Sequence, residues 1–187
     1  MKNFGPQTYF FPLPVLIITT YDENNNPNAM NAAWGGIHDT NQVHLCLSSD
    51  HKTTENIVKK GAFCISFATK ELVVESDYFG LKSGTKIPNK IEKAGLHVIK
   101  SEHVDAPIIE EYPVTLECKV HSLNEVDGTT YLVGDIINVG AKESVLDDNG
   151  KIDVTKCNFI TYDSSKHQYI VLGEVVGHAF KDGLKIK

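Results

Sequence analysis

Two short segments of this chain carry residue types that suit a cofactor. The first, Asn28–Trp34, reads Asn-Ala-Met-Asn-Ala-Ala-Trp, and its small side chains let a flat ligand approach the backbone closely. The second, Ser48–Thr54, places hydroxyls, a histidine and a lysine in front of a short predicted helix, where a phosphate is readily held. Together they indicate a cofactor with a planar ring at one end and a phosphate at the other. Flavin mononucleotide (FMN) fits this description best.

These segments need a scaffold, and the surrounding sequence predicts one made mainly of strands. Val15–Thr20 is a β-branched run that starts just after a proline, as a strand can. Asp22–Pro27 is typical of a turn, so Asn28–Trp34 is expected to complete a hairpin despite its low β-propensity. Weak propensity in a well-framed strand is typical of a functional surface.

The rest of the chain extends this β pattern. A helix is expected from Thr53, a plausible N-cap, to Lys60, with Gly61 ending it, and Asp127-Gly128 indicates a hairpin turn. Seven or eight strands with two or three helices favour a mainly β fold with inserted α-structure. An antiparallel barrel, closed or partly closed, is the economical arrangement because closure removes exposed strand edges. The other expected elements are strands over 42–48, 62–68, 114–120, 129–139, 157–162 and 169–172, helices over 71–78 and 91–95, and a loop over 80–90.

Composition narrows the class of protein. The chain has 187 residues, of which 41% are hydrophobic and 22% charged, which is ordinary for one globular domain spanning residues 1–187. A net charge of −6 disfavours binding to nucleic acid or to an anionic membrane, since both need a basic surface. Neither a signal peptide nor a run of about 20 apolar residues is found, so a cytoplasmic location is expected.

Several chemistries are not supported by motifs. Cys46, Cys64, Cys118 and Cys157 are widely spaced and form no C-x-x-C pair, so reduced core cysteines are favoured over a disulfide or metal role. The histidines are scattered, and no metal site is expected. No G-x-G-x-x-G follows a strand, and neither a P-loop nor a nucleophile elbow is present. A mononucleotide is therefore favoured over a tightly bound dinucleotide.

Several short segments lie along the chain in a distinctive order. They are Pro14–Thr20, Pro27–Trp34, Ser48–Thr54, Lys82-Ser83-Gly84 with Asn89-Lys90, Ala106-Pro107 and Gly173-Glu174-Val175. Each is a weak match alone, but together they cover nearly the whole chain, and their order resembles the flavin reductase-like, flavoredoxin-type family of FMN-binding split barrels. The resemblance implies an antiparallel split β-barrel that forms a homodimer, with FMN at the dimer interface.

Carried over to this chain, the resemblance implies a role for each site residue. Asn28, Ala29, Met30 and Asn31 would bind the polar edge of the flavin ring, and Trp34 would border it. Taken alone, Trp34 is better explained as a core or interface anchor, and the Asn-Ala-Met-Asn-Ala-Ala context favours the flavin.

The phosphate end follows from the second segment. Ser48 and Ser49 would contact the ribityl chain or the phosphate, and Lys52, Thr53 and Thr54 would hold the phosphate. His51 stands where many relatives carry an arginine and is charged only part of the time at neutral pH. A plain polar loop with a helix cap explains this segment equally well when it is taken alone.

Two residues come from further along the chain. Lys90 would add a second cation to the phosphate, although an isolated lysine is more often a solvated surface residue. Tyr162 would pack its ring near the cofactor.

The implied function is that of an FMN-dependent oxidoreductase. NADH or NADPH would give a hydride to FMN, and the electrons would pass to a flavin, a protein or a small acceptor. No side chain is expected to act as general acid or base. Two alternatives remain at this point: a flavoredoxin-type electron carrier without nicotinamide turnover, and a cofactor-free split-barrel binding module.

Overall fold

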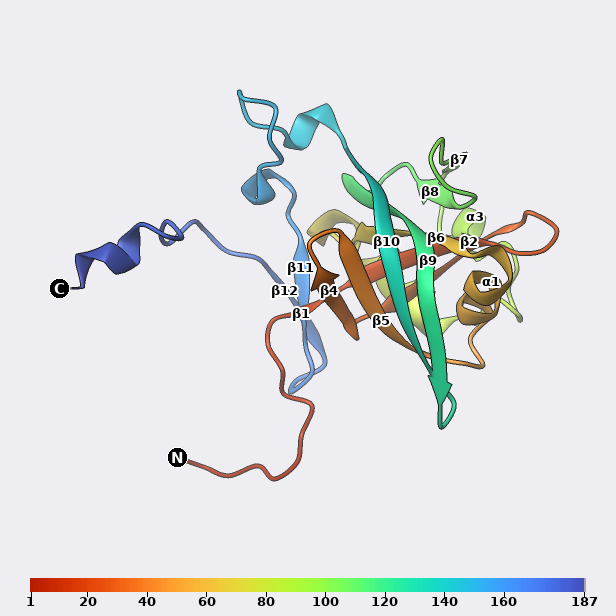
Figure 1. Cartoon of the computed structure of the whole chain (residues 1–187), viewed down its shortest axis with the longest axis horizontal. Coiled ribbons are helices and arrows are strands. Elements are labelled where there is room, and N and C mark those ends of the chain that lie inside the picture. The colour runs from red at the N-terminus through yellow and green to blue at the C-terminus, as the bar shows by residue number, and fades with distance from the viewer. Residues whose placement is uncertain (187) are drawn as a thin grey trace.

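A computed structural model describes residues 1–186 of the chain and centres on one curved antiparallel sheet (Figure 1). The strand order is β3-β2-β6-β9-β10-β5-β4, and every neighbouring pair is antiparallel. These strands are β2 (Leu16–Tyr21), β3 (Pro27–Ala32), β4 (Gly35–Asp39), β5 (Gln42–Ser48), β6 (Ala62–Phe67), β9 (Val114–Val126) and β10 (Thr129–Ala141).

Helices, short turns and two smaller sheets complete the structure. The helices are α1 (Lys52–Lys60), α2 (Val73–Leu81) and α3 (Lys90–Lys93), with 3-10 turns at Lys70–Leu72, Glu143–Val145, Val154–Lys156 and Asp182–Lys185. A second sheet has the order β1-β11-β12, formed by β1 (Leu13–Pro14), β11 (Ile160–Asp163) and β12 (Gln168–Val171). A small hairpin joins β7 (Val98–Lys100) to β8 (Pro107–Ile109).

The β2–β3 hairpin separates two parts of the core. Because successive side chains of a strand point to opposite faces, Leu16 and Ile18 pack inside the barrel with Phe63. Ile17 faces the other way and packs with Phe79 of α2. Strand β3 therefore has structure on both faces, with α1, α2 and α3 all in contact with it. This burial explains why a segment with weak β-propensity forms a strand.

The predicted hairpin at Asp127-Gly128 is confirmed. Both residues have positive φ, 49° and 77°, as a two-residue hairpin turn requires. Strand β9 runs well beyond the predicted 114–120, whereas β10 extends the predicted 129–139 only to Ala141. Beyond Val120, most side chains of β9 are exposed, and this part of the strand pairs only with β10. Cross-strand hydrogen bonds therefore extend the hairpin where burial gives the sequence no strong signal.

Other sequence predictions needed correction. Thr53 is not the N-cap: α1 starts at Lys52, His51 is the cap, and the Thr53 hydroxyl bonds to Asn28 instead. The helix expected at 71–78 begins with a 3-10 turn and continues to Leu81. Within residues 1–186 there are twelve strands rather than seven or eight, because short strands such as β1 and β7 lie in segments where no strand was predicted.

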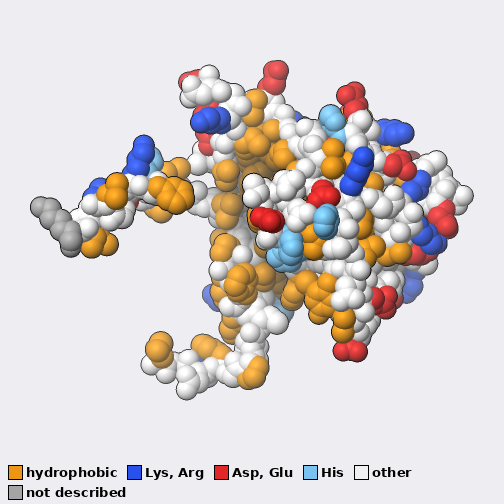
Figure 2. All heavy atoms as spheres, in the orientation of Figure 1, with side chains coloured by type: hydrophobic (Ala, Val, Ile, Leu, Met, Phe, Trp, Pro, Cys, Tyr) orange, Lys and Arg blue, Asp and Glu red, His pale blue; other side chains and the backbone are white. Residues whose placement is uncertain are grey.

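Both ends of the chain extend away from the barrel as arms, here the N-terminal arm (residues 1–12) and the C-terminal arm (residues 172–186) (Figure 1). Figure 2 shows hydrophobic side chains along both arms. Phe10, Val176 and Phe180 are 76%, 92% and 100% exposed. Among the described residues, no helix is long and apolar enough to cross a membrane.

Candidate functional site

A groove with two adjoining parts lies along β3. The parts have volumes of about 570 and 370 Å³ and share Met30, Asn31, His51 and Gly80 in their walls. We call them the aromatic half and the lysine half. In the shared wall, Gly80 packs against Asn31: a Cβ added to Gly80 would lie 3.4 Å from the Cβ of Asn31.

The aromatic half is lined mainly by flat and small side chains. Trp34 is 51% exposed at one border, and Tyr162 and Tyr169 lie with their ring centroids 5.9 Å apart. Apart from the shared residues, its walls are Val15, Ala32, Ala33, Trp34, Cys46, Leu47, Ser48, Asp77, Tyr162, His167 and Tyr169.

Two hydrogen-bonded pairs bring polar atoms into the aromatic half. The Tyr162 Oη and His167 Nδ1 atoms are 2.7 Å apart, and Tyr169 Oη donates to Asp77 Oδ1 at 2.8 Å. Burial, followed by the hydrogen bond to Asp77, raises the pKa of Tyr169 to about 12. Tyr169 is therefore a protonated donor at neutral pH.

The lysine half gathers cations. Lys52 comes from the first turn of α1, Lys82 and Lys86 come from the loop after α2, and Lys90 begins α3. Against these four lysines, the lining contains the single carboxylate of Asp50. The other lining residues are Thr53, Phe79, Leu81, Ser83 and Gly84. Such a cluster, next to hydroxyls and a helix N-terminus, suits a phosphate.

Lys90 is a buried cation, only 2% exposed. Its Nζ donates to the Lys82 carbonyl at 2.8 Å and to the Phe79 carbonyl at 3.3 Å, and it lies 5.9 Å from the Phe79 ring centroid. Burial lowers the pKa of Lys90 to about 8. An anion in the lysine half would favour the charged form.

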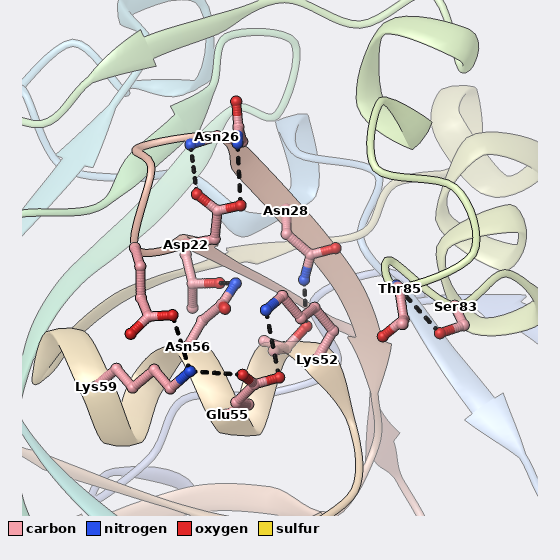
Figure 3. Close-up of polar contacts among 12 residues, drawn as sticks. Asp22, Asn26, Asn28, Lys52, Glu55, Asn56, Lys59, Ser83 and Thr85 are labelled. Atoms are coloured by element: carbon pink, nitrogen blue, oxygen red, sulfur yellow. Dashed lines mark hydrogen bonds and ion pairs between the residues drawn. The ribbon is translucent and has the colours of Figure 1, made fainter.

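Asn28 fixes the geometry beneath this half. Its Nδ2 donates to Thr53 Oγ1 at 2.7 Å, and Figure 3 shows it pointing from β3 towards α1, with the Ser83–Thr85 turn nearby. Asn28 is 5% exposed, and its Oδ1 has no hydrogen-bond partner among residues 1–186. The atom nearest to a Cβ built on Gly84 would be this Oδ1. A buried acceptor without a hydrogen-bond partner therefore lies beneath Gly84 of the lysine half.

Lys52 is partly engaged within α1. Its Nζ lies 3.2 Å from Glu55, which also pairs with Lys59 at 2.7 Å (Figure 3). Exposed ion pairs of this kind contribute little. Lys52 can therefore turn to another anion at small cost.

The structure brings most of the predicted site residues together in one groove. Four do not line it: Asn28 and Ala29 are buried, Ser49 Oγ lies 2.8 Å from Thr130 Oγ1, and Thr54 Oγ1 donates to the Ser48 carbonyl at 2.8 Å. Thr54 thus shapes the turn before α1. Their contacts with a cofactor stay predictions, as do those of the residues that line the groove, namely Met30, Asn31, Trp34, Ser48, His51, Lys52, Thr53, Lys90 and Tyr162.

Several lining residues were not predicted from the sequence. Asp77 reaches the groove from α2, and His167 and Tyr169 reach it from the β11–β12 hairpin; no local sequence pattern signals either arrangement. All four cysteines are free, as expected, but Cys46 is not a core residue: it is half-buried and lines the aromatic half. Lys90, which alone suggests a solvated surface residue, is instead buried.

Comparison with known proteins gives the family. Residues 8–156 match the sequence model of the flavin reductase like domain, and the chain therefore belongs to the flavin reductase-like family. The flavoredoxin of Desulfovibrio vulgaris (Miyazaki F) is 33% identical, with 98% of this chain and 99% of that chain covered and a TM-score of 0.93.

A flavoredoxin from Methanosarcina acetivorans is 26% identical over the full length of both chains, with a TM-score of 0.90. An uncharacterized protein of Pyrococcus abyssi is 25% identical over 154 residues, which cover 81% of this chain and 86% of that protein. The resemblance seen in the sequence and the mainly antiparallel split-barrel fold are both confirmed.

Proposed function

We propose that the groove binds FMN, with the flavin ring in the aromatic half and the phosphate in the lysine half. The observation that carries this proposal is the continuity of the two halves: a volume walled by flat side chains adjoins one walled by four lysines. A ligand with a planar ring and a terminal phosphate matches both halves at once.

The residues of the groove would divide the work of binding. Lys52 and Lys90 would neutralise the phosphate, and the Thr53 hydroxyl would donate to it. Trp34 and Tyr162 would contact the ring, while Met30 and Asn31 stand where both halves meet. Once bound, FMN supplies the hydride and electron chemistry of the site.

We propose that the chain works as an oxidoreductase that accepts a hydride from NADH or NADPH and passes electrons to a small acceptor or a protein. Membership of the flavin reductase-like family supports this activity. The second candidate is an electron carrier without nicotinamide turnover, and the similarity to two flavoredoxins favours it.

Absorbance spectroscopy tests these proposals in sequence. The purified chain mixed with FMN should retain a yellow chromophore after desalting, and a colourless protein would overturn the assignment of the groove. The yellow protein is then mixed anaerobically with NADH and, separately, with NADPH. Bleaching within seconds supports the reductase, whereas bleaching by dithionite alone would leave the carrier as the function.

We also propose that a second copy of the chain covers the exposed arms. Apolar side chains such as Val176 and Phe180 are almost fully exposed, and exposed patches of this kind mark interfaces. Light scattering should give the mass of a homodimer. Phe180→Asp should shift the chain towards monomer, and Val58→Asp, on the exposed side of α1 and 56% exposed in the wild type, should not. A monomeric wild-type chain would contradict the proposal.

A further inference from the structure

The β11–β12 hairpin places a hydrogen-bonded tyrosine and histidine in the aromatic half of the groove. The Tyr162 Oη and His167 Nδ1 atoms are 2.7 Å apart, and both residues line this half. Tyr162 is half-buried, whereas His167 is exposed. The pair therefore links the interior of the groove to bulk water.

The turn between the two strands holds His167 in place. The Asp163 carboxylate accepts hydrogen bonds from the Ser165 backbone at 2.9 Å, the Ser165 hydroxyl at 2.6 Å and the Gln168 amide at 2.9 Å. His167 has a φ of 54°, a conformation that costs a residue with a side chain more than it costs glycine. Its imidazole is thus fixed opposite the tyrosine hydroxyl.

The neighbouring tyrosine is less suited to exchange protons. Tyr169 Oη already donates to Asp77 at 2.8 Å, and its raised pKa, about 12, disfavours loss of the proton. Tyr162 instead has a partner that can both give and take a proton. Of the two tyrosines, Tyr162 is the one able to release a proton and regain it.

We propose that Tyr162 and His167 form a proton relay, and that the chain reduces acceptors which take up protons with electrons, such as quinones. This rests on the proposed oxidoreductase function. When a quinone receives a hydride at one carbonyl oxygen, a new O–H bond forms there, the two carbonyl π bonds shift into the ring, and an electron pair collects on the other oxygen. The Oη–H bond of Tyr162 then breaks, and its proton moves to that oxygen.

Recovery of the proton uses the exposed member of the pair. Protonated His167 returns a proton from Nδ1 to the tyrosine oxygen, and the neutral imidazole then takes one from water. Each turnover consumes one hydride and one proton, and the quinone leaves as the hydroquinone. General acid catalysis of this kind typically contributes 10²–10⁴-fold to a rate.

Other titrating groups face the pair and shape any pH profile. Asp77 on α2 and Tyr169 on β12 lie in the same half of the groove, with His51 before α1 and Cys46 on β5. Asp163 lies in the hairpin itself, where hydrogen bonds to Ser165 and Gln168 lower its pKa. A dependence that belongs to the relay must disappear in the His167→Gln variant, since these groups are unchanged there.

The test compares two acceptors with the FMN-loaded, reduced chain. Menadione, a quinone, takes up protons on reduction, whereas ferricyanide takes one electron and no proton. Tyr162→Phe should slow menadione reduction by about 10²-fold or more, and far more than it slows ferricyanide reduction. His167→Gln should also remove the fall of the menadione rate with rising pH. The control is Tyr131→Phe. Tyr131 lies near the start of β10 and is 49% exposed in the wild type, and this variant should have the wild-type rates.

A second readout needs no cofactor. In a nitrogen NMR spectrum of the histidine rings, Tyr162→Phe should move the Nδ1 resonance of His167 and leave the other histidines in place. An unmoved resonance, an unchanged menadione rate, or equal slowing with ferricyanide would each overturn the relay. If the wild-type chain takes up no FMN, the proposed function fails and the relay with it. If FMN binds and is reduced while Tyr162→Phe behaves as the wild type, only the relay fails.

Discussion

Gly84 offers a sharp test of the phosphate end of the groove. A Cβ at this position would overlap Asn28 Oδ1 and stand 2.9 Å from its Cγ. Asn28 is buried and tied to Thr53 at 2.7 Å, so it has little room to yield. In Gly84→Ala, either the loop carrying Lys82 and Lys86 must move outward, or the bond between Asn28 and Thr53 must break.

Either adjustment disturbs the lysine half. Overpacking of this kind typically costs about 1–3 kcal/mol, which corresponds to an increase of roughly 5- to 150-fold in Kd if it falls on the bound state. The loss should be specific to the phosphate because Gly84 lines the lysine half and not the aromatic half. Riboflavin, which has the ring without the phosphate, should therefore lose much less affinity than FMN.

Titration of flavin fluorescence measures both dissociation constants. Gly140→Ala is the matched control, since nothing lies within 4 Å of a Cβ built there, and it should bind FMN as the wild type does. In an Asn28→Ala background the penalty of Gly84→Ala should shrink, because the overlapping atoms are gone. The reasoning is refuted if Gly84→Ala binds FMN within twofold of the wild type, or if riboflavin loses as much affinity as FMN.

Three further predictions concern single residues. FMN affinity should fall between pH 7 and pH 9, because burial lowers the pKa of Lys90 to about 8 and the side chain then loses the charge that attracts the phosphate. Calorimetry at several pH values measures this affinity. The Lys90→Met variant should show no pH dependence in this range, and a remaining slope would assign the effect to another group. A thiol reagent should modify Cys46 before Cys118, because burial raises the pKa of Cys118 to about 12, and bound FMN should slow the modification of Cys46. Peptide mass spectrometry measures the modification of each cysteine. If FMN does not slow the modification of Cys46, its place in the groove is contradicted. Glu117 is buried and accepts hydrogen bonds from Asn138 at 2.6 Å and from Ser101. The substitution Glu117→Gln should therefore lower the free energy of unfolding by about 1–3 kcal/mol. Urea denaturation measures this free energy, and an unchanged midpoint would contradict the prediction.

The fold was predictable where local chemistry and burial agree. The β-branched run before Asp22 and the Asp127-Gly128 turn each force one local geometry, and both hairpins are present. The start of α1 was misplaced because Thr53 has a choice that its local sequence does not show: its hydroxyl can cap the helix or bond to Asn28, 25 residues away. Tertiary contact decided between them.

Residue composition predicted the candidate site only in two segments, whereas Lys90 and Tyr162 were predicted from the family resemblance. Asn28–Trp34 and Ser48–Thr54 were found because their composition departs from what a strand and a loop need for folding alone. His167 and Tyr169 give no such signal, since histidine and tyrosine are ordinary residues of an exposed hairpin. Their place in the groove depends on how β11 and β12 pack beside β3, which is set by contacts distant in the sequence.

The burial of Lys90 argues that the lysine half is built for an anion. A buried ammonium costs free energy unless it is paired, and Lys90 finds two carbonyls but no carboxylate within ion-pair distance among residues 1–186. Lys82 and Lys86 line the same space and repel it. A cluster designed only for folding would gain by exposing this charge or pairing it. A bound phosphate dianion would offset two of these positive charges at once, so the arrangement favours a ligand that carries its negative charge at the end away from the aromatic half.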